Sequence, residues 1–262
     1  MISFASDYIA GAHPVIMQRL LETNMENLSG YGTDQYCAQA KEKIKQAFQC
    51  PDGEVFFLVG GTQTNQVIIS TMLAPYEGVI AAKTGHVSVH EAGAIEYSGH
   101  KVIELEEKDG KLAAEDIKKC IEDFYSDDNH EHMVYPGMVY ISFPTEYGTL
   151  YSKQELTEIS HICRSYKIPL FIDGARLGYG IESKENGLSP EEIAELCDVF
   201  YIGGTKVGAL FGEAVVITKS ALKKDFRYCM KQSGAMLAKG RLLGIQFDTL
   251  FTCLLYTSPS PR

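Results

Sequence analysis

The chain has 262 residues, enough to bury the core of one large domain or of a domain and a half. Apolar residues make up 45% of the chain and charged residues 22%, as in ordinary globular proteins, so disordered and fibrous classes are excluded. With 24 Lys and Arg against 34 Asp and Glu, the formal net charge is −10, which argues against nucleic acid or an anionic membrane as a partner.

Short apolar runs alternate along the chain with longer amphipathic segments. Continuous apolar runs bounded by Gly, Pro or Asp predict strands buried on both faces at 55–59, 79–82, 101–105, 138–142, 170–172, 199–202 and 214–217. Amphipathic spacing predicts helices at 34–48, 65–73, 113–125, 153–166 and from about 237 to 251. Because strands and helices alternate, we expect an α/β fold with a mostly parallel seven-stranded sheet flanked by helices.

The end of the chain breaks this pattern. From Cys253 to Arg262 the sequence is rich in Ser and Pro and has no helical period. This tail resembles translated sequencing-adapter read-through, although a genuine disordered tail would have the same composition. We therefore expect residues 1–251 to form one large domain and residues 252–262 to be foreign to the protein.

Cellular location and redox state are indicated by two further patterns. The sequence contains no apolar run of the roughly 20 residues that a membrane-spanning helix needs, and its start lacks the charged and apolar regions of a signal peptide. A cytoplasmic protein is therefore expected. Seven scattered cysteines contain no C-x-x-C pair, which favours reduced thiols and predicts no metal site.

Ligands of open parallel sheets bind at the carboxyl ends of the strands, and two such ends come early in this chain. The segment from Gly60 to Asn65 leads from a strand into a helix, where glycines and the first helical N–H groups suit a phosphate. It matches no nucleotide motif, and a plain glycine turn is the alternative. His86 follows the next strand and starts a probable helix, although a lone histidine there can also be structural.

Two later strand ends carry an acid and a lysine. Asp173 directly follows a buried strand, where its carboxylate can face a ligand. Alternatively it caps the next helix and pairs with Arg176. Lys206 lies among glycines and apolar residues, where a desolvated amine becomes nucleophilic, the alternative being an exposed loop lysine. A phosphate cup, an Asp and a Lys in that order favour pyridoxal 5′-phosphate, with the lysine forming a Schiff base and the acid holding the pyridine nitrogen protonated.

The sequence from about residue 4 to residue 251 resembles the low-specificity threonine aldolases, which belong to the β-eliminating lyases of the aspartate-aminotransferase-like group (fold type I). The resemblance rests on six blocks: Ser6-Asp7, Gly30-Tyr31-Gly32-Thr33-Asp34, Gly60-Gly61-Thr62-Gln63-Thr64-Asn65, His86 with Glu91-Ala92-Gly93, Asp173-Gly174-Ala175-Arg176, and Gly203-Gly204-Thr205-Lys206. It implies the large domain of that fold, and the small C-terminal domain of the family is missing from this chain.

The resemblance also implies a role for each matching residue. Lys206 would bind the cofactor covalently, Asp173 would pair with the pyridine nitrogen, and His86 would stack on the ring and assist proton transfer. Phosphate binding falls to Gly61, Thr62 and Gln63, and binding of the substrate carboxylate to Ser6 and Arg176. The implied reaction is retro-aldol cleavage of threonine, allo-threonine or phenylserine to glycine and an aldehyde, by a homodimer or homotetramer.

One departure from the family concerns the base that takes the hydroxyl proton. Many members carry a second histidine after the strand at 139–143, where this chain has Pro144-Thr145-Glu146. Glu146 or a water is the candidate replacement. The alternatives to an aldolase are a β-eliminating lyase acting on aromatic or sulfur amino acids and an inactive fragment that only binds the cofactor.

A basic segment completes the expectations from the family. Because its members share sites between subunits, the segment 226–232 is expected to contribute a basic group toward the phosphate of a neighbouring subunit. Either Arg227 or Lys231 would supply that group.

Overall fold

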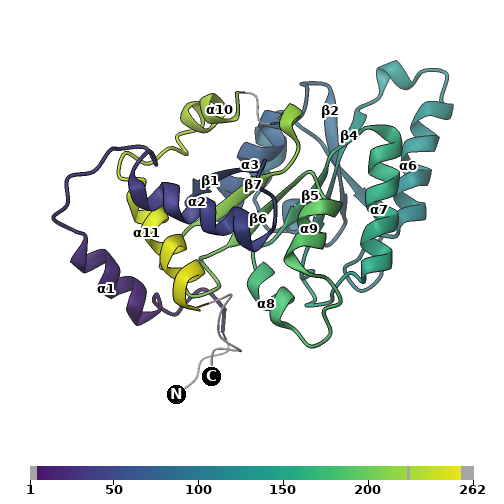
Figure 1. Ribbon diagram of the computed structural model, residues 1–262. Coiled ribbons are helices and arrows are strands. Elements are labelled where there is room, and N and C mark those ends of the chain that lie inside the picture. The colour runs from purple at the N-terminus through teal and green to yellow at the C-terminus, as the bar shows by residue number, and fades with distance from the viewer. Residues whose placement is uncertain (1–4, 223–224, 255–262) are drawn as a thin grey trace.

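The computed structural model describes residues 5–222 and 225–254, and its centre is one seven-stranded sheet (Figure 1). The strand order is β1-β7-β6-β5-β4-β2-β3. The strands are β1 Glu54–Leu58, β2 Glu77–Ala82, β3 Val102–Leu105, β4 Tyr135–Ser142, β5 Leu170–Asp173, β6 Val199–Gly203 and β7 Glu213–Ile217. Neighbours from β3 to β6 are parallel, and β7 is antiparallel to both β6 and β1. The expected mostly parallel seven-stranded sheet is therefore confirmed.

Helices connect and cover these strands. They are α1 Pro14–Glu22, α2 Gln35–Ala47, α3 Gly61–Met72, α4 His86–Val89, α5 Ala94–Tyr97, α6 Ala114–Ser126, α7 Lys153–Tyr166, α8 Leu177–Glu182, α9 Pro190–Leu196, α10 Phe226–Gln232 and α11 Arg241–Thr249. A π-helical turn, Leu250–Leu254, continues α11, so helical structure extends past the expected end at 251. Of the predicted tail at 252–262, residues 255–262 lie outside the described residues.

The sheet separates two apolar cores because successive side chains of each strand point to opposite faces. Phe57 and Val139 pack with α2, α6, α7, α9 and α11 on one face, whereas Phe56 and Met138 pack with α3, α5 and α10 on the other. Figure 1 shows the resulting three layers, with the strands between the helices. Burial on both faces explains why the strands appear in the sequence as continuous apolar runs.

The strand ends at β5 and β6 are packed unusually closely. A Cβ at Gly174 would lie 1.9 Å from the carbonyl oxygen of Tyr201, and a Cβ at Gly203 would lie 2.1 Å from that of Ala175. Only glycine fits at these two positions, and the N–H of Gly203 donates to the carbonyl of Gly174 at 2.8 Å. The turns that follow Asp173 and precede Lys206 are thereby held against each other.

Candidate active site

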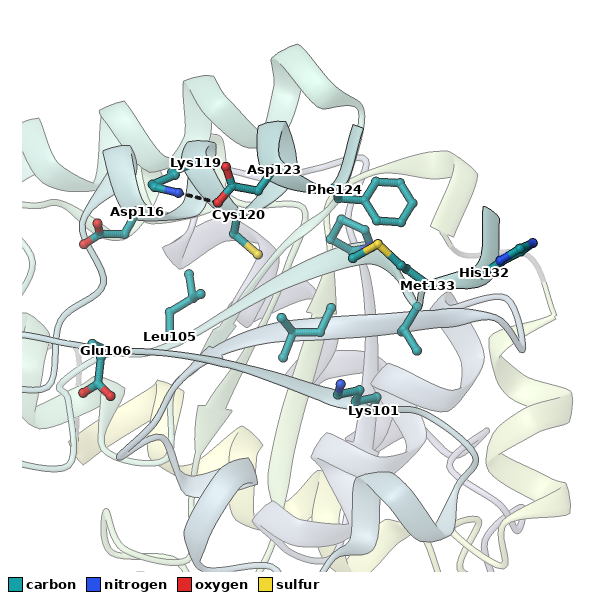
Figure 2. Close-up of a pocket in the computed structure, with 13 residues that line it drawn as sticks. Lys101, Leu105, Glu106, Asp116, Lys119, Cys120, Asp123, Phe124, His132 and Met133 are labelled. Atoms are coloured by element: carbon teal, nitrogen blue, oxygen red, sulfur yellow. Dashed lines mark hydrogen bonds and ion pairs between the residues drawn. The ribbon is translucent and has the colours of Figure 1, made fainter. Parts of the chain in front are cut away.

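One hollow, of about 730 Å³, lies between α6 and β3. Figure 2 shows Cys120, Phe124 and Met133 lining it, with Lys119 and Asp123 paired to each other on α6. Burial, with a contribution from Asp123, raises the pKa of the Cys120 thiol, which keeps it protonated and unreactive. This groove therefore offers no evident chemistry.

The second hollow, about 150 Å³, lies at the carboxyl ends of the parallel strands. Six residues predicted from the sequence line it together: Gly61, His86, Glu146, Asp173, Arg176 and Lys206. Thr62 and Gln63 follow Gly61 in the first turn of α3. The structure thus brings the reactive groups of separate strand ends into one cavity.

Asp173 ends β5 and is only 4% exposed, yet its carboxylate has four hydrogen-bond donors. Oδ1 accepts from the N–H of Ala175 at 3.0 Å and from the hydroxyl of Tyr201, and Oδ2 accepts from Asn65 Nδ2 at 3.0 Å and from the hydroxyl of Tyr140 at 2.6 Å. Hydrogen bonds to a charged group contribute about 1.5–3 kcal/mol each, so together they offset a burial cost of several kcal/mol. Burial and the charge of Asp173 raise the pKa of both tyrosines well above its usual value, so the phenols remain donors.

A chain of hydrogen bonds links Asp173 to His86. Asn65 Nδ2 also donates to Glu91 Oε1 at 2.7 Å, and this oxygen lies 2.8 Å from His86 Nδ1. The hydrogen bond to Glu91 raises the pKa of His86 against the opposing effect of burial, and the charges of Asp173 and Glu91 add to the increase. Because Glu91 holds Nδ1, the other ring nitrogen of His86 is the one available for proton exchange.

Glu146 lies beside His86 in the loop after β4. Its Oε1 accepts hydrogen bonds from the backbone N–H of His86 at 2.8 Å and from Ser142 Oγ at 2.6 Å. Both bonds fall on Oε1, which leaves Oε2 with the capacity to accept a proton. The carboxylate is thus fixed at the start of α4 and within the cavity.

Arg176 and the N-terminal segment meet at the same cavity. The guanidinium group donates to both carboxylate oxygens of Asp7, from Nε and, at 3.2 Å, from Nη2. Burial raises the pKa of Asp7, but the hydrogen bond and charge of Arg176 and the charge of Lys206 outweigh it and leave that pKa below its usual value. Ser6 is half-buried next to Asp7, and Tyr8 lines the cavity.

The first turn of α3 forms another part of the cavity wall. Its N–H groups have no acceptor within the helix, and the positive end of the helix dipole lies with them, so this turn suits an anion. Gly60 and Gly61 line the cavity, and a Cβ at Gly60 would meet nothing within 4 Å. Gln63 Oε1 instead accepts from the N–H of Val59 at 3.3 Å, so that side chain turns back toward the strand.

Lys206 follows β6 and is half-buried in the cavity wall. Beside it lies Glu213, which the sequence analysis did not identify. Glu213 is 3% exposed and begins β7. The only sequence signal was an acid directly before the apolar run 214–217. Asn65, Tyr140 and Tyr201 were missed as well, since their contacts with Asp173 depend on how strands and helices pack.

Arg227 and Lys231, the two basic candidates of α10, lie around Tyr31 and outside this cavity. Arg227 Nη2 donates to the carbonyl of Tyr31 at 3.0 Å, and Lys231 Nζ lies 4.5 Å from the centre of the Tyr31 ring. Together with Tyr228 and Met236 they line a separate hollow of about 570 Å³. The expectation that one of them reaches a neighbouring subunit stays a prediction.

Two kinds of feature are absent from the residues that the structure describes. Within residues 5–222 and 225–254, no three His, Cys, Asp or Glu side chains are grouped so that they could hold a metal ion. In that part of the chain no helix is both long and apolar enough to cross a membrane.

Comparison with known proteins finds consistent relatives. The beta-eliminating lyase family matches residues 3–245. The low specificity L-threonine aldolases of Pseudomonas aeruginosa and of a Pseudomonas species are 34% and 33% identical, each across 92% of this chain and 68% of the relative. A solved threonine aldolase structure from Leishmania major is 47% identical, with a TM-score of 0.94 over 98% of this chain and 74% of that one. Aspartate aminotransferase from Thermus thermophilus is 16% identical and shares the fold. Its TM-score is 0.73, and the match covers 95% of this chain and 64% of the aminotransferase chain.

Proposed function

Because this chain belongs to the beta-eliminating lyase family, we propose that it cleaves threonine and related β-hydroxy-α-amino acids into glycine and an aldehyde. The chain is a pyridoxal-phosphate-dependent lyase, and its curated relatives carry the name low specificity L-threonine aldolase. The observation that carries the proposal is the convergence of Lys206, Asp173 and the first turn of α3 on one cavity.

These residues fit pyridoxal phosphate by the chemistry of their groups. The cofactor has an aldehyde, a pyridine nitrogen and a phosphate, and the cavity offers an amine, a buried carboxylate and a helix N-terminus. The phosphate would lie at the N–H groups of Gly61, Thr62 and Gln63. When bound, the cofactor withdraws electrons from the α-carbon of the substrate, so that a bond to that carbon can break.

The chain's own residues supply the remaining tasks. Lys206 provides the amine for covalent attachment, and Asp173, held by four donors, keeps a negative charge in place for the pyridine nitrogen. His86, fixed at Nδ1 by Glu91, would border the ring and exchange protons through its other nitrogen. We assign the β-hydroxyl proton to Glu146, whose Oε2 can accept it while Oε1 stays bound to the protein.

The substrate carboxylate would be bound by Arg176 with help from Ser6. Asp7 already occupies the edge of the guanidinium group formed by Nε and Nη2. The substrate therefore shares that group with Asp7 or displaces it. This competition favours substrates whose carboxylate reaches the guanidinium in a bidentate manner.

The test is to supply L-threonine, L-phenylserine and L-tryptophan separately and to identify the products. We expect glycine with acetaldehyde from the first and glycine with benzaldehyde from the second. Pyruvate and ammonia would instead assign the chain to β-elimination on aromatic or sulfur amino acids. A cofactor absorbance band without any product would identify an inactive cofactor-binding fragment.

Three further properties belong to the same proposal. We propose that residues 1–251 are the large cofactor domain, that residues 252–262 are foreign, and that the enzyme is a cytoplasmic homodimer or homotetramer. Light scattering tests the oligomeric state. Sequencing the gene beyond the codon for Phe251 tests the domain boundary, and a continuation that keeps Cys253 to Arg262 would contradict it.

A further inference from the structure

Glu213 is a buried acid that the proposed chemistry does not use. Its backbone is paired on both sides, with Gly203 of β6 and with Leu58 of the edge strand β1. Its side chain lines the same cavity as Lys206. A carboxyl group in such a position is costly to bury, so its contacts need a reason.

Both oxygens of Glu213 bind the residues directly before Lys206. Oε1 accepts from Thr205 Oγ1 at 2.8 Å, and Oε2 accepts from the N–H of Gly204 at 3.0 Å. Thr205 Oγ1 in turn accepts from the N–H of Gly212 at 3.0 Å, and the N–H of Thr205 donates to the carbonyl of Gly212 at 3.1 Å. These bonds close the loop that carries Lys206.

The charge of Glu213 is coupled to that of Lys206. Burial and the charge of Asp173 raise the pKa of Glu213 to about 8, against the lowering effect of the hydrogen bonds from Thr205 and Gly204 and of the charge of Lys206. The carboxyl group of Glu213 therefore lies near enough to the amine of Lys206 for the two groups to interact.

Other groups face the same pair. The hydroxyl of Tyr201 faces Glu213, since the acid contributes to the raised pKa of that tyrosine. Asp7 and His86 face Lys206, whose charge lowers the pKa of both. These neighbours stay in place when only the charge of Glu213 is changed, so they form a constant background.

We propose that Glu213 is a positioning residue for Lys206, because its two hydrogen bonds fix the loop that carries the lysine at the cavity wall. The proposal rests on the assignment of Lys206 as the cofactor-binding amine.

The test measures how fast Lys206 is acetylated in the full chain prepared without cofactor, with exposed Lys184 as the internal reference. In Glu213→Gln the amide accepts from Gly204 and donates to Thr205, so the loop is kept and the charge is lost. We expect labelling of Lys206 near pH 6.5 to stay within about twofold of the wild type, because both hydrogen bonds to the loop are kept.

Two further variants complete the design. Glu213→Leu also removes both hydrogen bonds, so Lys206 should be labelled about fivefold faster than in Glu213→Gln at the same pH, and equal rates would overturn the positioning role. Glu54→Gln, at the exposed opposite end of β1, is the matched control and should leave the labelling unchanged. Circular dichroism confirms that each variant is folded. Labelling records neither cofactor nor product, so this result is independent of whether the chain is an aldolase.

Discussion

Two hollows of this protein, the groove and the cavity, show that volume does not indicate reactivity: the one with the larger volume has the less reactive side chains. The groove between α6 and β3 has about 730 Å³, whereas the cavity at the strand ends has about 150 Å³. In the groove, Lys119 and Asp123 are exposed and bind each other (Figure 2). In the cavity, Asp173 and Glu213 are buried within reach of one lysine. Burying a charge costs free energy, so buried charged residues indicate a functional site better than the volume of a hollow does.

The difference follows from position in the sheet. The groove flanks β3, an edge strand with one neighbour, and the charged side chains that line it are exposed to solvent. The cavity lies where β4, β5 and β6 end and α3 begins, so that four elements contribute polar groups to one point. Matched substitutions in the groove and in the cavity test this difference.

The largest effect is expected for Lys206→Ala, which removes the amine that attaches the cofactor. The value of kcat/KM for threonine should fall by about a thousandfold or more, and the absorbance band of the bound cofactor should disappear. Lys119→Ala in the groove is the matched control and should leave both unchanged. A Lys206→Ala variant that keeps a tenth of the activity would place the reactive amine elsewhere.

A smaller effect is expected for Glu146→Gln, because the amide keeps the hydrogen bonds of Oε1 but cannot accept a proton. We expect kcat to fall about a hundredfold with little change in KM. Steady-state kinetics on threonine measure both. Glu106→Gln, at the rim of the groove, is the control. An unchanged kcat would transfer the role of base to a water molecule or to His86.

Glu91→Gln should act mainly on pH dependence. The hydrogen bond that His86 donates to Glu91 is the main cause of the raised pKa of His86, so the variant should lower that pKa, as an NMR titration of the ring can show. Protonated His86 stabilises the fold below its unfolded pKa of about 6.5, and this contribution is lost as pH rises through the folded value. The variant should therefore lose more stability near pH 5.5 than near pH 8.5, and an equal loss at both would contradict the coupling.

The smallest effect is expected for Cys120→Ser in the groove. Burial and the charge of Asp123 raise the pKa of its thiol and outweigh the opposite effect of Lys119, so the thiol is not activated. Activity should stay within about twofold of the wild type, as for a substitution remote from the site. A larger loss in kcat/KM would mean that the groove takes part in function after all.

Much of the fold was predictable because both faces of the sheet are buried. Most strands appear as continuous apolar runs, and all seven were located to within three residues. The largest error is at the start of β4, where Tyr135 and Pro136 pair with Glu77 and Gly78 across an irregular register that no local pattern reveals. The short helices α5, α8 and α9 span too few residues for their periodicity to be detected.

The site was predictable where a residue follows a strand and not where it depends on packing. Asp173, Lys206 and His86 come directly after strands, so their common edge follows from topology. Glu213 binds the loop of Lys206 only because β7 runs antiparallel to β6, and Asn65 joins two carboxylates only because α3 crosses that edge. Neither contact can be inferred from the local sequence.

The contact between Gly174 and Gly203 has a consequence for engineering. Because neither position tolerates a side chain, the turn after Asp173 and the turn before Lys206 form one rigid unit. The spacing of the two backbone segments that carry the acid and the lysine is therefore set by the scaffold and is not a quantity that directed evolution can adjust at these glycines. Libraries that aim at a new aldehyde acceptor should vary the cavity wall outside that unit, for example at the exposed Tyr8.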